Sequence, residues 1–454
     1  MGATGKSKRT EELINADIAH IVNPMATVGE HMGVVFERTR DRIYIVDTEG
    51  KAYIDLTAGL MCCNLGHQQK AIQDAIVEAI RRTDYTTCYY GFGNTDVIKC
   101  AQLLAEITPG DLNHFHFVTG GSEVSDTATK IARLYWHYKG KGTKQKIISL
   151  YNSYHGLAGI STYLTRMLQG APQRGFGTEP GGYLRIPSYY CYRCLFGASY
   201  PDCDMLCARY LKSVIEGEGP DSIAAFFAEP IQCSGVAIDP PPEYWPLIRK
   251  ICQDYDILLI VDEVMTGFTR TAKMFAVEHW NVVPDMMLMA KGITSAYLPF
   301  GALAFNDRVY EALKGSLFVH GMTYSGHPIP SAASVATLQL YEKQKVVENA
   351  AKVGRYIRKR LEDEVLPLPC VGNIGGKGMF QGIELINDKE SKTVIDPNVK
   401  LDLFRNMLDN GLYGRITGAL GNRLFISPPC TMTLEEAGKA LDILVPLLAA
   451  LKPK

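Results

Sequence analysis

The segment Asp256-Ile257-Leu258-Leu259-Ile260-Val261-Asp262-Glu263-Val264 carries the strongest structural signal in this sequence. It is an unbroken apolar run that ends in a carboxylate, which is typical of a strand buried on both faces of a parallel sheet. A second apolar run, at residues 285–290, ends in Lys291. Ligands of open α/β sheets bind beyond the carboxyl ends of the strands. The two runs therefore predict that an acid, Asp262, and an amine, Lys291, meet in one crevice.

Other apolar runs alternate with helical patterns on both sides of this segment. Further strands are predicted at residues 113–118, 147–150, 223–228 and 301–305, and helices at residues 69–82, 243–255 and from about 331 onward. This alternation predicts an α/β fold with a doubly wound, mostly parallel sheet. Short strands outside that sheet are expected at residues 34–38, 42–47, 52–56, 378–385 and 423–427. Residues 1–16 are polar, and we expect them to fray or to lie across a partner surface.

Length and composition exclude several classes of protein. A chain of 454 residues is too long for one ordinary core, so two domains are expected. The net charge of -1 gives no basic surface for nucleic acid, and no run approaches the roughly 20 apolar residues that span a membrane. The first residues lack the apolar core of a secretion signal. Twelve scattered cysteines favour a reducing cytoplasm.

Two segments that follow predicted strands could bind the ends of a planar phosphate ester. Thr119-Gly120-Gly121-Ser122-Glu123 joins a strand to a helix, an arrangement that holds phosphate on free N–H groups at the positive end of the helix dipole. An ordinary turn with Ser122 as the N-cap is the alternative. Tyr154-His155-Gly156 could offer a flat surface to a ring. Taken alone, these aromatic residues are more simply explained as ordinary core residues.

Asp262 and Lys291 together suggest a specific chemistry, because about one strand–helix–strand crossover separates them. A lysine in an apolar crevice becomes a nucleophile toward carbonyls. A carboxylate that faces a pyridine nitrogen keeps this nitrogen protonated and makes the ring an electron sink. With the phosphate segment and Tyr154, these groups meet the needs of pyridoxal phosphate. Individually, Asp262 could be a strand-end cap and Lys291 a surface residue.

The sequence resembles the class III (ω-) aminotransferases of the fold-type I pyridoxal-phosphate enzymes, from about Asn23 to Pro429. The most specific match is Val261-Asp262-Glu263-Val264-Met265-Thr266-Gly267-Phe268-Thr269-Arg270, followed by Ala290-Lys291-Gly292. The resemblance implies a large cofactor-binding domain at residues 69–330 with a seven-stranded-type sheet. It also implies a smaller α+β domain built from residues 1–68 and 331–454.

The resemblance also implies roles for individual residues toward pyridoxal phosphate. Lys291 would bind the cofactor aldehyde as a Schiff base and act as general acid–base, and Asp262 would pair with the ring nitrogen. Tyr154 would stack on one face of the ring and Val264 would pack against the other. The remaining cofactor contacts would come from Gly121, Ser122, His155, Glu229 and, from the neighbouring subunit, Thr323. A homodimer is therefore expected, and the pairing of dimers into a tetramer stays open.

On the substrate side, the resemblance places a mobile arginine at Arg415, which would bind the carboxylate of a keto acid. Arg423 is a rival a few residues further on. Leu60 and Met61 would line the donor pocket, and Met61 stands where several amine transaminases have tryptophan. The slimmer, adaptable thioether leads us to expect that longer or bulkier amines are admitted. Cys233 stands where glycine is common, which puts substrate choice in doubt rather than the chemistry.

Four cysteines, at positions 191, 194, 203 and 207, loosely resemble a zinc knuckle. Relatives of the family carry a similar Cys-Tyr-Arg-Cys segment without a catalytic metal, so we predict no metal. The predicted function is a pyridoxal-phosphate-dependent ω-aminotransferase that moves an amino group from an amine or ω-amino acid to a keto acid, with pyruvate as the favoured acceptor. The alternative is a decarboxylase, aminomutase or phospho-lyase on the same scaffold.

Overall fold

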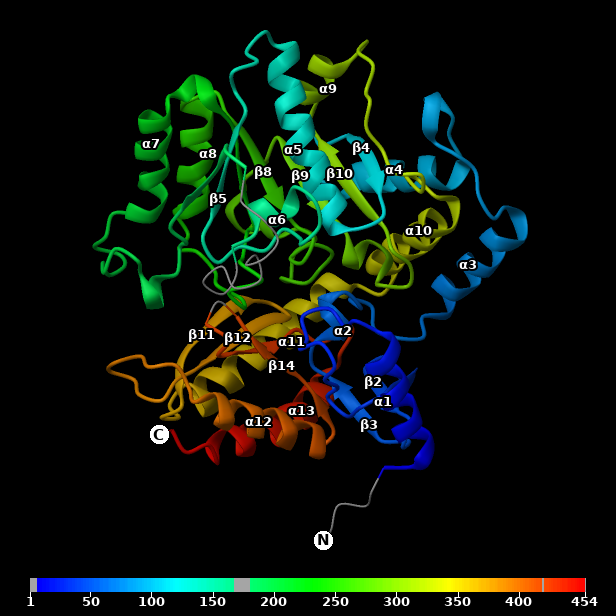
Figure 1. Cartoon of the computed structure of the whole chain (residues 1–454), viewed down its shortest axis with the longest axis vertical. Coiled ribbons are helices and arrows are strands. Elements are labelled where there is room, and N and C mark those ends of the chain that lie inside the picture. The colour runs from blue at the N-terminus through cyan, green and yellow to red at the C-terminus, as the bar shows by residue number, and fades with distance from the viewer. Residues whose placement is uncertain (1–5, 167–179, 419, 454) are drawn as a thin grey trace.

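A seven-stranded sheet forms the centre of the larger part of the molecule (Figure 1). The structure, a computed structural model, describes residues 6–166, 180–418 and 420–453. The strand order is β4-β10-β9-β8-β7-β5-β6, and only β10 runs antiparallel to its neighbours. The strands are β4 (His114–Val118), β5 (Lys146–Leu150), β6 (Tyr183–Ile186), β7 (Ile223–Ala228), β8 (Leu258–Asp262), β9 (Met286–Met289) and β10 (Gly301–Phe305). The predicted mostly parallel, doubly wound sheet is confirmed.

Strand β8 explains why its sequence is apolar throughout. Leu258 and Ile260 belong to the core on one face of the sheet, and Leu259 and Val261 belong to the core on the other face. Because both faces are covered, every position must be apolar until the strand ends. The helices around the large sheet are α3 (Lys70–Arg82), α4 (Thr95–Ile107), α5 (Gly121–Tyr138), α6 (Ser161–Leu164), α7 (Leu206–Glu218), α8 (Tyr244–Asp254), α9 (Asp307–Leu313) and α10 (Pro328–Lys343).

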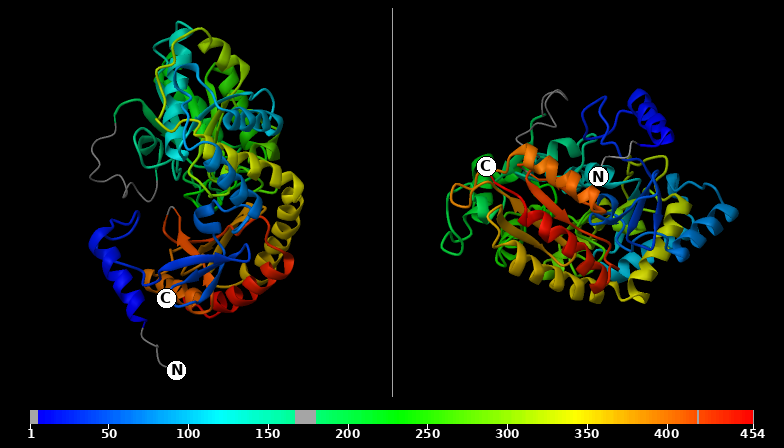
Figure 2. Two further views of the ribbon diagram at one scale, coloured as in Figure 1. Left: turned by 90° about the vertical axis from the view of Figure 1, so that its right-hand side faces the viewer. Right: turned by 90° about the horizontal axis from the view of Figure 1, so that it is seen from below.

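Two four-stranded sheets form the smaller part of the molecule, stacked against the larger part along the long axis (Figures 1 and 2). The first contains β1 (Phe36–Arg40), β2 (Tyr44–Asp47), β3 (Ala52–Asp55) and β13 (Leu412–Tyr413). The second contains β11 (Val371–Lys377), β12 (Phe380–Leu385), β14 (Arg415–Thr417) and β15 (Arg423–Ile426). Helices α11 (Val346–Arg360), α12 (Pro397–Asp409) and α13 (Leu434–Ala449) pack nearby. Strand β13, from the C-terminal part of the chain, pairs with β3, from the N-terminal part, so both parts share one sheet. The domain limits at residues 68 and 330 stay a prediction.

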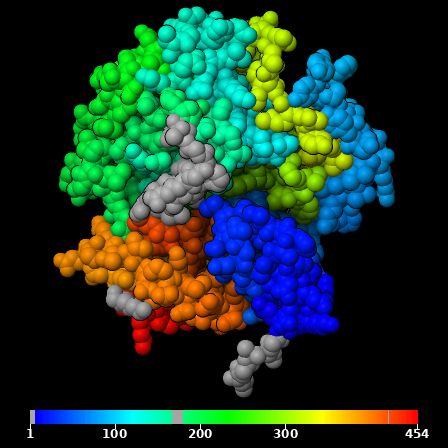
Figure 3. Space-filling model, viewed as in Figure 1, coloured from blue at the N-terminus to red at the C-terminus, as the bar shows by residue number. Residues whose placement is uncertain are grey.

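The N-terminal segment differs from the expectation that it frays. Helix α1 (Lys8–His20) begins after Ser7, whose side chain accepts a hydrogen bond from the Thr10 N–H. The Ser7 and Thr10 hydroxyls also donate to Glu49, which ties the helix to the turn after β2. The cap itself is local, but the contact that anchors the helix to the rest of the molecule lies 42 residues away at Glu49 and could not be inferred from a polar segment. Residues 1–5 lie outside the described residues. Figure 3 shows the N-terminal residues in blue beside the orange C-terminal part.

Short elements complete the chain. They are helix α2 (Ala58–Met61) and the helical turns Tyr89–Gly91, Cys191–Arg193, Pro220–Ser222, Ala276–Trp280, Lys291–Thr294 and Leu361–Val365. Within the described ranges, no helix is both long and apolar enough to cross a membrane. The turn that begins at Lys291 matters most for function, because it directly follows β9.

Candidate active site

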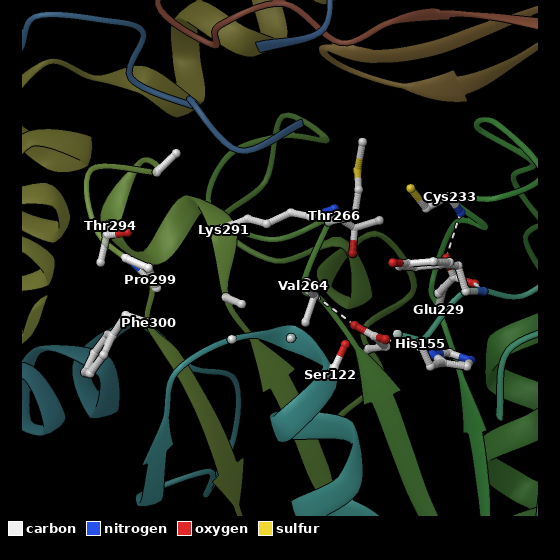
Figure 4. A pocket seen from close by; sticks show the side chains of 18 of the residues that line it. Ser122, His155, Glu229, Cys233, Val264, Thr266, Lys291, Thr294, Pro299 and Phe300 are labelled. Atoms are coloured by element: carbon white, nitrogen blue, oxygen red, sulfur yellow. Dashed lines mark hydrogen bonds and ion pairs between the residues drawn. The ribbon is translucent and has the colours of Figure 1, made fainter. Parts of the chain in front are cut away.

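A cavity of about 350 Å³ lies at the carboxyl ends of the central strands (Figure 4). Strands β8 and β9 are adjacent and parallel, with Asp262 paired to Leu288. Their ends therefore bring Asp262 and Lys291 into the same cavity. Its wall includes the following residues predicted for the cofactor: Gly121, Ser122, Tyr154, His155, Glu229, Asp262, Val264 and Lys291.

Lys291 is placed by a tight backbone turn at the end of β9. Its φ of 47° lies in the left-handed region, which a residue with a Cβ rarely adopts. Gly292 follows, and a Cβ there would lie 2.6 Å from Asn64 Nδ2. Strain of this kind persists where surrounding contacts hold the backbone. Figure 4 shows the Lys291 side chain extended across the cavity, so its amine faces the open space.

Asp262 is a buried carboxylate with both oxygens engaged. Its Oδ2 lies 2.7 Å from His155 Nδ1, and its Oδ1 accepts a hydrogen bond of 3.0 Å from the Val264 N–H. His155 Nε2 is buried and has no hydrogen-bond partner among the described residues. The His155 ring packs edge-on against Phe227. These contacts fix the orientation of the Asp262 carboxylate at the cavity wall.

The first turn of α5 forms the opposite end of the cavity. Gly120 precedes this 18-residue helix with an extended backbone and offers no side-chain cap, so Ser122 is not the N-cap. The first N–H groups of a helix have no partner within it, which makes this end suited to an anion. A Cβ at Gly121 would come within 3.1 Å of Val264 Cγ1. Glycine therefore keeps the cavity floor open at this point.

Glu229 connects two loops that line the cavity. Its Oε1 accepts a hydrogen bond of 2.8 Å from the Cys233 N–H, and its Oε2 accepts one of 3.1 Å from the Tyr154 N–H. Burial raises the pKa of the Glu229 carboxyl to about 7, with a further upward contribution from the charge of Asp262. The charged form of Glu229 is favoured by nearby His155 and by these two backbone donors.

A second cavity, of about 140 Å³, adjoins the first and shares Tyr154, Cys233 and Lys291 with it. Its other lining residues are Met25, Leu60, Met61, Ser234, Arg415, Thr417 and Phe425. The predicted substrate residues Leu60, Met61 and Arg415 therefore lie together beside Lys291. These walls come from the N-terminal segment, the loop after β7 and the β14–β15 hairpin.

Arg415 and Arg423 occupy different environments. Arg423 is 2% exposed, and its Nη1 contacts Glu384 Oε2 at 3.2 Å and the Tyr190 hydroxyl at 2.6 Å. Arg415 is half-buried and lines the second cavity, and its guanidinium makes no hydrogen bond to another described residue. Of these two arginines, only Arg415 is therefore free to bind a ligand.

Thr323 lies outside both cavities of its own chain. It is exposed in the loop before α10, and its carbonyl accepts a hydrogen bond of 2.7 Å from the Tyr85 hydroxyl. The cysteines at positions 191, 194, 203 and 207 are free thiols. Across the described part of the chain, no three His, Cys, Asp or Glu side chains are arranged to hold a metal. The absence of a metal stays a prediction.

Sequence reasoning missed a polar network beneath the active-site lysine. Arg270 is fully buried, and its guanidinium donates to Asn64 Oδ1 at 2.6 Å and to the Ser427 carbonyl at 2.9 Å. Asn64 Nδ2 donates to the Phe268 carbonyl at 2.7 Å. These contacts join both parts of the molecule below Lys291. Arg270 stood in the quoted motif, but its partners lie too far away in sequence to be inferred.

The residues around the first cavity fit pyridoxal phosphate. An amine, a fixed carboxylate and a helix N-terminus stand where the aldehyde, ring nitrogen and phosphate of that cofactor need partners. The space that the missing side chain of Gly121 leaves beside Val264 is part of this fit. Tyr154 and Val264, the residues expected to cover the two faces of the ring, both line this cavity.

Comparisons with known proteins agree with this geometry. The family model "Aminotransferase class-III" matches residues 25–448. The putrescine–pyruvate aminotransferase of Pseudomonas aeruginosa is 35% identical over 406 residues, covering 88% of this chain and 87% of that protein. An (S)-enantioselective omega-transaminase from Thermomicrobium roseum has a TM-score of 0.91 at 35% identity and covers 97% and 98% of the two chains. An amine transaminase from an uncultivated Pseudomonas species, solved in the PLP-bound form, has a TM-score of 0.89 at 32% identity over 95% and 99%.

The predicted family, fold class and cofactor are confirmed by these matches. The family match extends over both parts of the molecule and includes Asp262, Lys291 and Arg415. The chain therefore belongs to the class III aminotransferases, which depend on pyridoxal phosphate.

Proposed function

We propose that this aminotransferase takes an amino group from an aliphatic amine or ω-amino acid and passes it to pyruvate. The observation that carries the proposal is the junction of the two cavities at Lys291. One cavity suits the cofactor, and the other combines apolar walls with a single arginine. The name of the Pseudomonas aeruginosa relative, a putrescine–pyruvate aminotransferase, supports the same pair of substrate classes.

Each residue of the first cavity has a distinct task in this proposal. When bound, pyridoxal phosphate supplies an electron sink for the charge left as the donor carbon loses a proton. Lys291 Nζ takes that proton and returns it as general acid–base. Asp262, oriented by His155, pairs with the ring nitrogen, and the N–H groups of Gly121 and Ser122 hold the phosphate. Tyr154 and Val264 cover the two faces of the ring.

The second cavity serves both substrates in turn. Arg415 binds the keto-acid carboxylate, for which its planar guanidinium is suited. Leu60, Met61 and Phe425 offer apolar contact to the carbon chain of a donor that has no carboxylate next to its amine. One pocket can therefore accept a charged acceptor and an uncharged chain, provided that Arg415 moves.

We further propose a homodimer in which Thr323 of one subunit completes the phosphate site of the other. The loop around Thr323 is bordered by exposed apolar side chains, including Val319 at 85% and Tyr90 at 93% exposure. Tyr85, a few residues before Tyr90, connects its own loop to the loop around Thr323, since its ring packs edge-on against Tyr324. Apolar patches of this kind mark protein interfaces. A cytoplasmic location is also proposed, supported by twelve free cysteines.

The test is a donor and acceptor screen with the purified holoenzyme. Putrescine, β-alanine and taurine are each supplied with pyruvate, and alanine is measured by chromatography. Donor alone should bleach the absorbance of the bound cofactor, and pyruvate should restore it. Carbon dioxide or phosphate release without alanine would contradict the proposal. Light scattering should give twice the mass of one chain.

A further inference from the structure

Cys233 occupies the junction between the two cavities. Three residues line both of them, namely Tyr154, Cys233 and Lys291. Tyr154 and Lys291 already have roles toward the cofactor in the proposed function. Cys233 is the remaining shared side chain, and in the second cavity it lines the same wall space as Arg415. A donor carbon that reacts at Lys291 must therefore pass beside the Cys233 sulfur.

The backbone that carries this side chain is held by hydrogen bonds. The Cys233 N–H donates to Glu229 Oε1 at 2.8 Å, and the Cys233 carbonyl accepts a hydrogen bond of 2.8 Å from the Val236 N–H. Residues on both sides are also anchored, since the Gln232 N–H donates to the Ile238 carbonyl and the Ser234 hydroxyl to the Asn152 carbonyl. Figure 4 shows the sulfur pointing from its loop toward Lys291. It is a rigid wall.

The Cys233 thiol acts through its volume rather than through charge. The side chain is 6% exposed, and burial raises the pKa of the thiol to about 12. A neutral, buried thiol behaves as a small apolar group. Its neighbours in the second cavity, Met61 and Phe425, are apolar as well.

We propose that the Cys233 side chain is a size filter that limits the substituent a donor carries on its amine-bearing carbon. Donors of the type R–CH₂–NH₂ leave a hydrogen beside the sulfur and fit. Donors with a larger group on that carbon place it against a wall that cannot move away. This inference rests on the proposed function, because it requires an amine donor in the second cavity.

The test compares holoenzymes of the wild type, Cys233→Gly, Cys233→Ser and Cys233→Val. Each is assayed with pyruvate and primary amines of one chain length whose amine-bearing carbon carries hydrogen, methyl, ethyl or propyl. The ratio of kcat/KM for the ethyl donor to that for the unsubstituted donor should rise about 10-fold or more in Cys233→Gly, the range expected for one or two methylenes in a pocket. It should fall in Cys233→Val. Cys233→Ser, nearly equal in size, should keep the wild-type ratio.

Cys252→Ala is the matched control, since Cys252 is also a fully buried thiol but lies in α8, outside both cavities. Its ratio should equal that of the wild type. Cofactor absorbance and the thermal unfolding midpoint show whether each variant is folded and loaded. An unchanged ratio in loaded Cys233→Gly and Cys233→Val would overturn the filter while leaving the proposed function intact. Failure of the wild type to make alanine from any donor would instead overturn the proposed function.

Discussion

The two joined cavities are built in opposite ways. The first is formed by strand ends and one helix start within residues 119–300, and its key acid is buried and doubly hydrogen-bonded. The second collects walls from positions as distant as Met25 and Phe425, and its arginine is half-buried and unpaired by any described residue. Rigid, pre-positioned groups suit chemistry, whereas loosely held groups suit a pocket that must accept two substrates. We expect substitutions in the first cavity to abolish turnover and substitutions in the second cavity to change substrate preference.

The largest effect is expected for Lys291→Ala. Removing both the covalent anchor and the general acid–base should lower kcat at least about 10⁴-fold for every donor. Steady-state alanine formation measures this. Lys250→Ala, which removes an exposed lysine paired with Asp254, is the control. A kcat within 10-fold of the wild type for Lys291→Ala would show that the first cavity does not carry the chemistry.

Asp262→Asn should come next, with a loss of about 10²- to 10³-fold in kcat, comparable to the removal of one pre-positioned polar group. The amide keeps the shape but lacks the charge that would hold the ring nitrogen protonated. Binding of pyridoxal phosphate, followed by absorbance, should persist. Asp254→Asn, at an exposed position of α8, should leave kcat as it is. Equal losses for both would point to a general charge effect.

Arg415→Ala should raise the KM for pyruvate about 10- to 100-fold, because hydrogen bonds to charged groups contribute about 1.5–3 kcal/mol. The rate of the half-reaction with an amine lacking a carboxylate should change little. Arg423→Ala provides the contrast, since removing one partner of a buried ion pair costs about 3–5 kcal/mol. It should lower the unfolding midpoint rather than change KM selectively. If Arg423→Ala raised the KM for pyruvate and Arg415→Ala lowered only the unfolding midpoint, Arg423 would be the substrate-binding arginine.

A smaller effect is expected for Met61→Trp, which fills part of the second cavity. Long-chain donors should lose about 10-fold in kcat/KM, and the shortest donors should lose little, because each excluded methylene costs about 1–3 kcal/mol. Rates across an amine length series measure this. If the wild type itself accepts only the shortest donors, the expected role of Met61 is wrong.

The smallest effect concerns pH. The Glu229 carboxyl, with a pKa raised to about 7 by burial, gains a proton as the pH falls through 7. The protonated oxygen is a poorer acceptor for the N–H groups of Cys233 and Tyr154, so kcat/KM should decline below that pH. Because the raised pKa disfavours the charged form in the folded state, stability should move the other way: it should decline as the pH rises from the ordinary pKa of 4.5 to about 7 and level off above that. Glu229→Gln should remove the pH dependence of both kcat/KM and stability in this range. Measurements of kcat/KM and of the unfolding midpoint against pH check this.

Several features could be predicted because they depend on neighbours in the sequence. Strand β8 is buried on both faces, so its apolar run and terminal Asp262 are visible without a structure. The glycines before α5 and the lysine after β9 follow from the same pattern. Helix α1 was missed because its segment is polar and its anchor, Glu49, lies 42 residues from Ser7. Strand β6 was missed because its four residues carry no unbroken apolar run.

By itself, the sequence determined the order of strand ends and hence which acid and which amine face one crevice, because chain direction in a parallel sheet leaves no other edge for them. Only the tertiary structure decided between Arg415 and Arg423, because Glu384 and Tyr190 neutralise one of them from other segments. It also placed Cys233, Lys291 and Arg415 around one cavity, although they lie too far apart along the chain for any periodicity to reveal this.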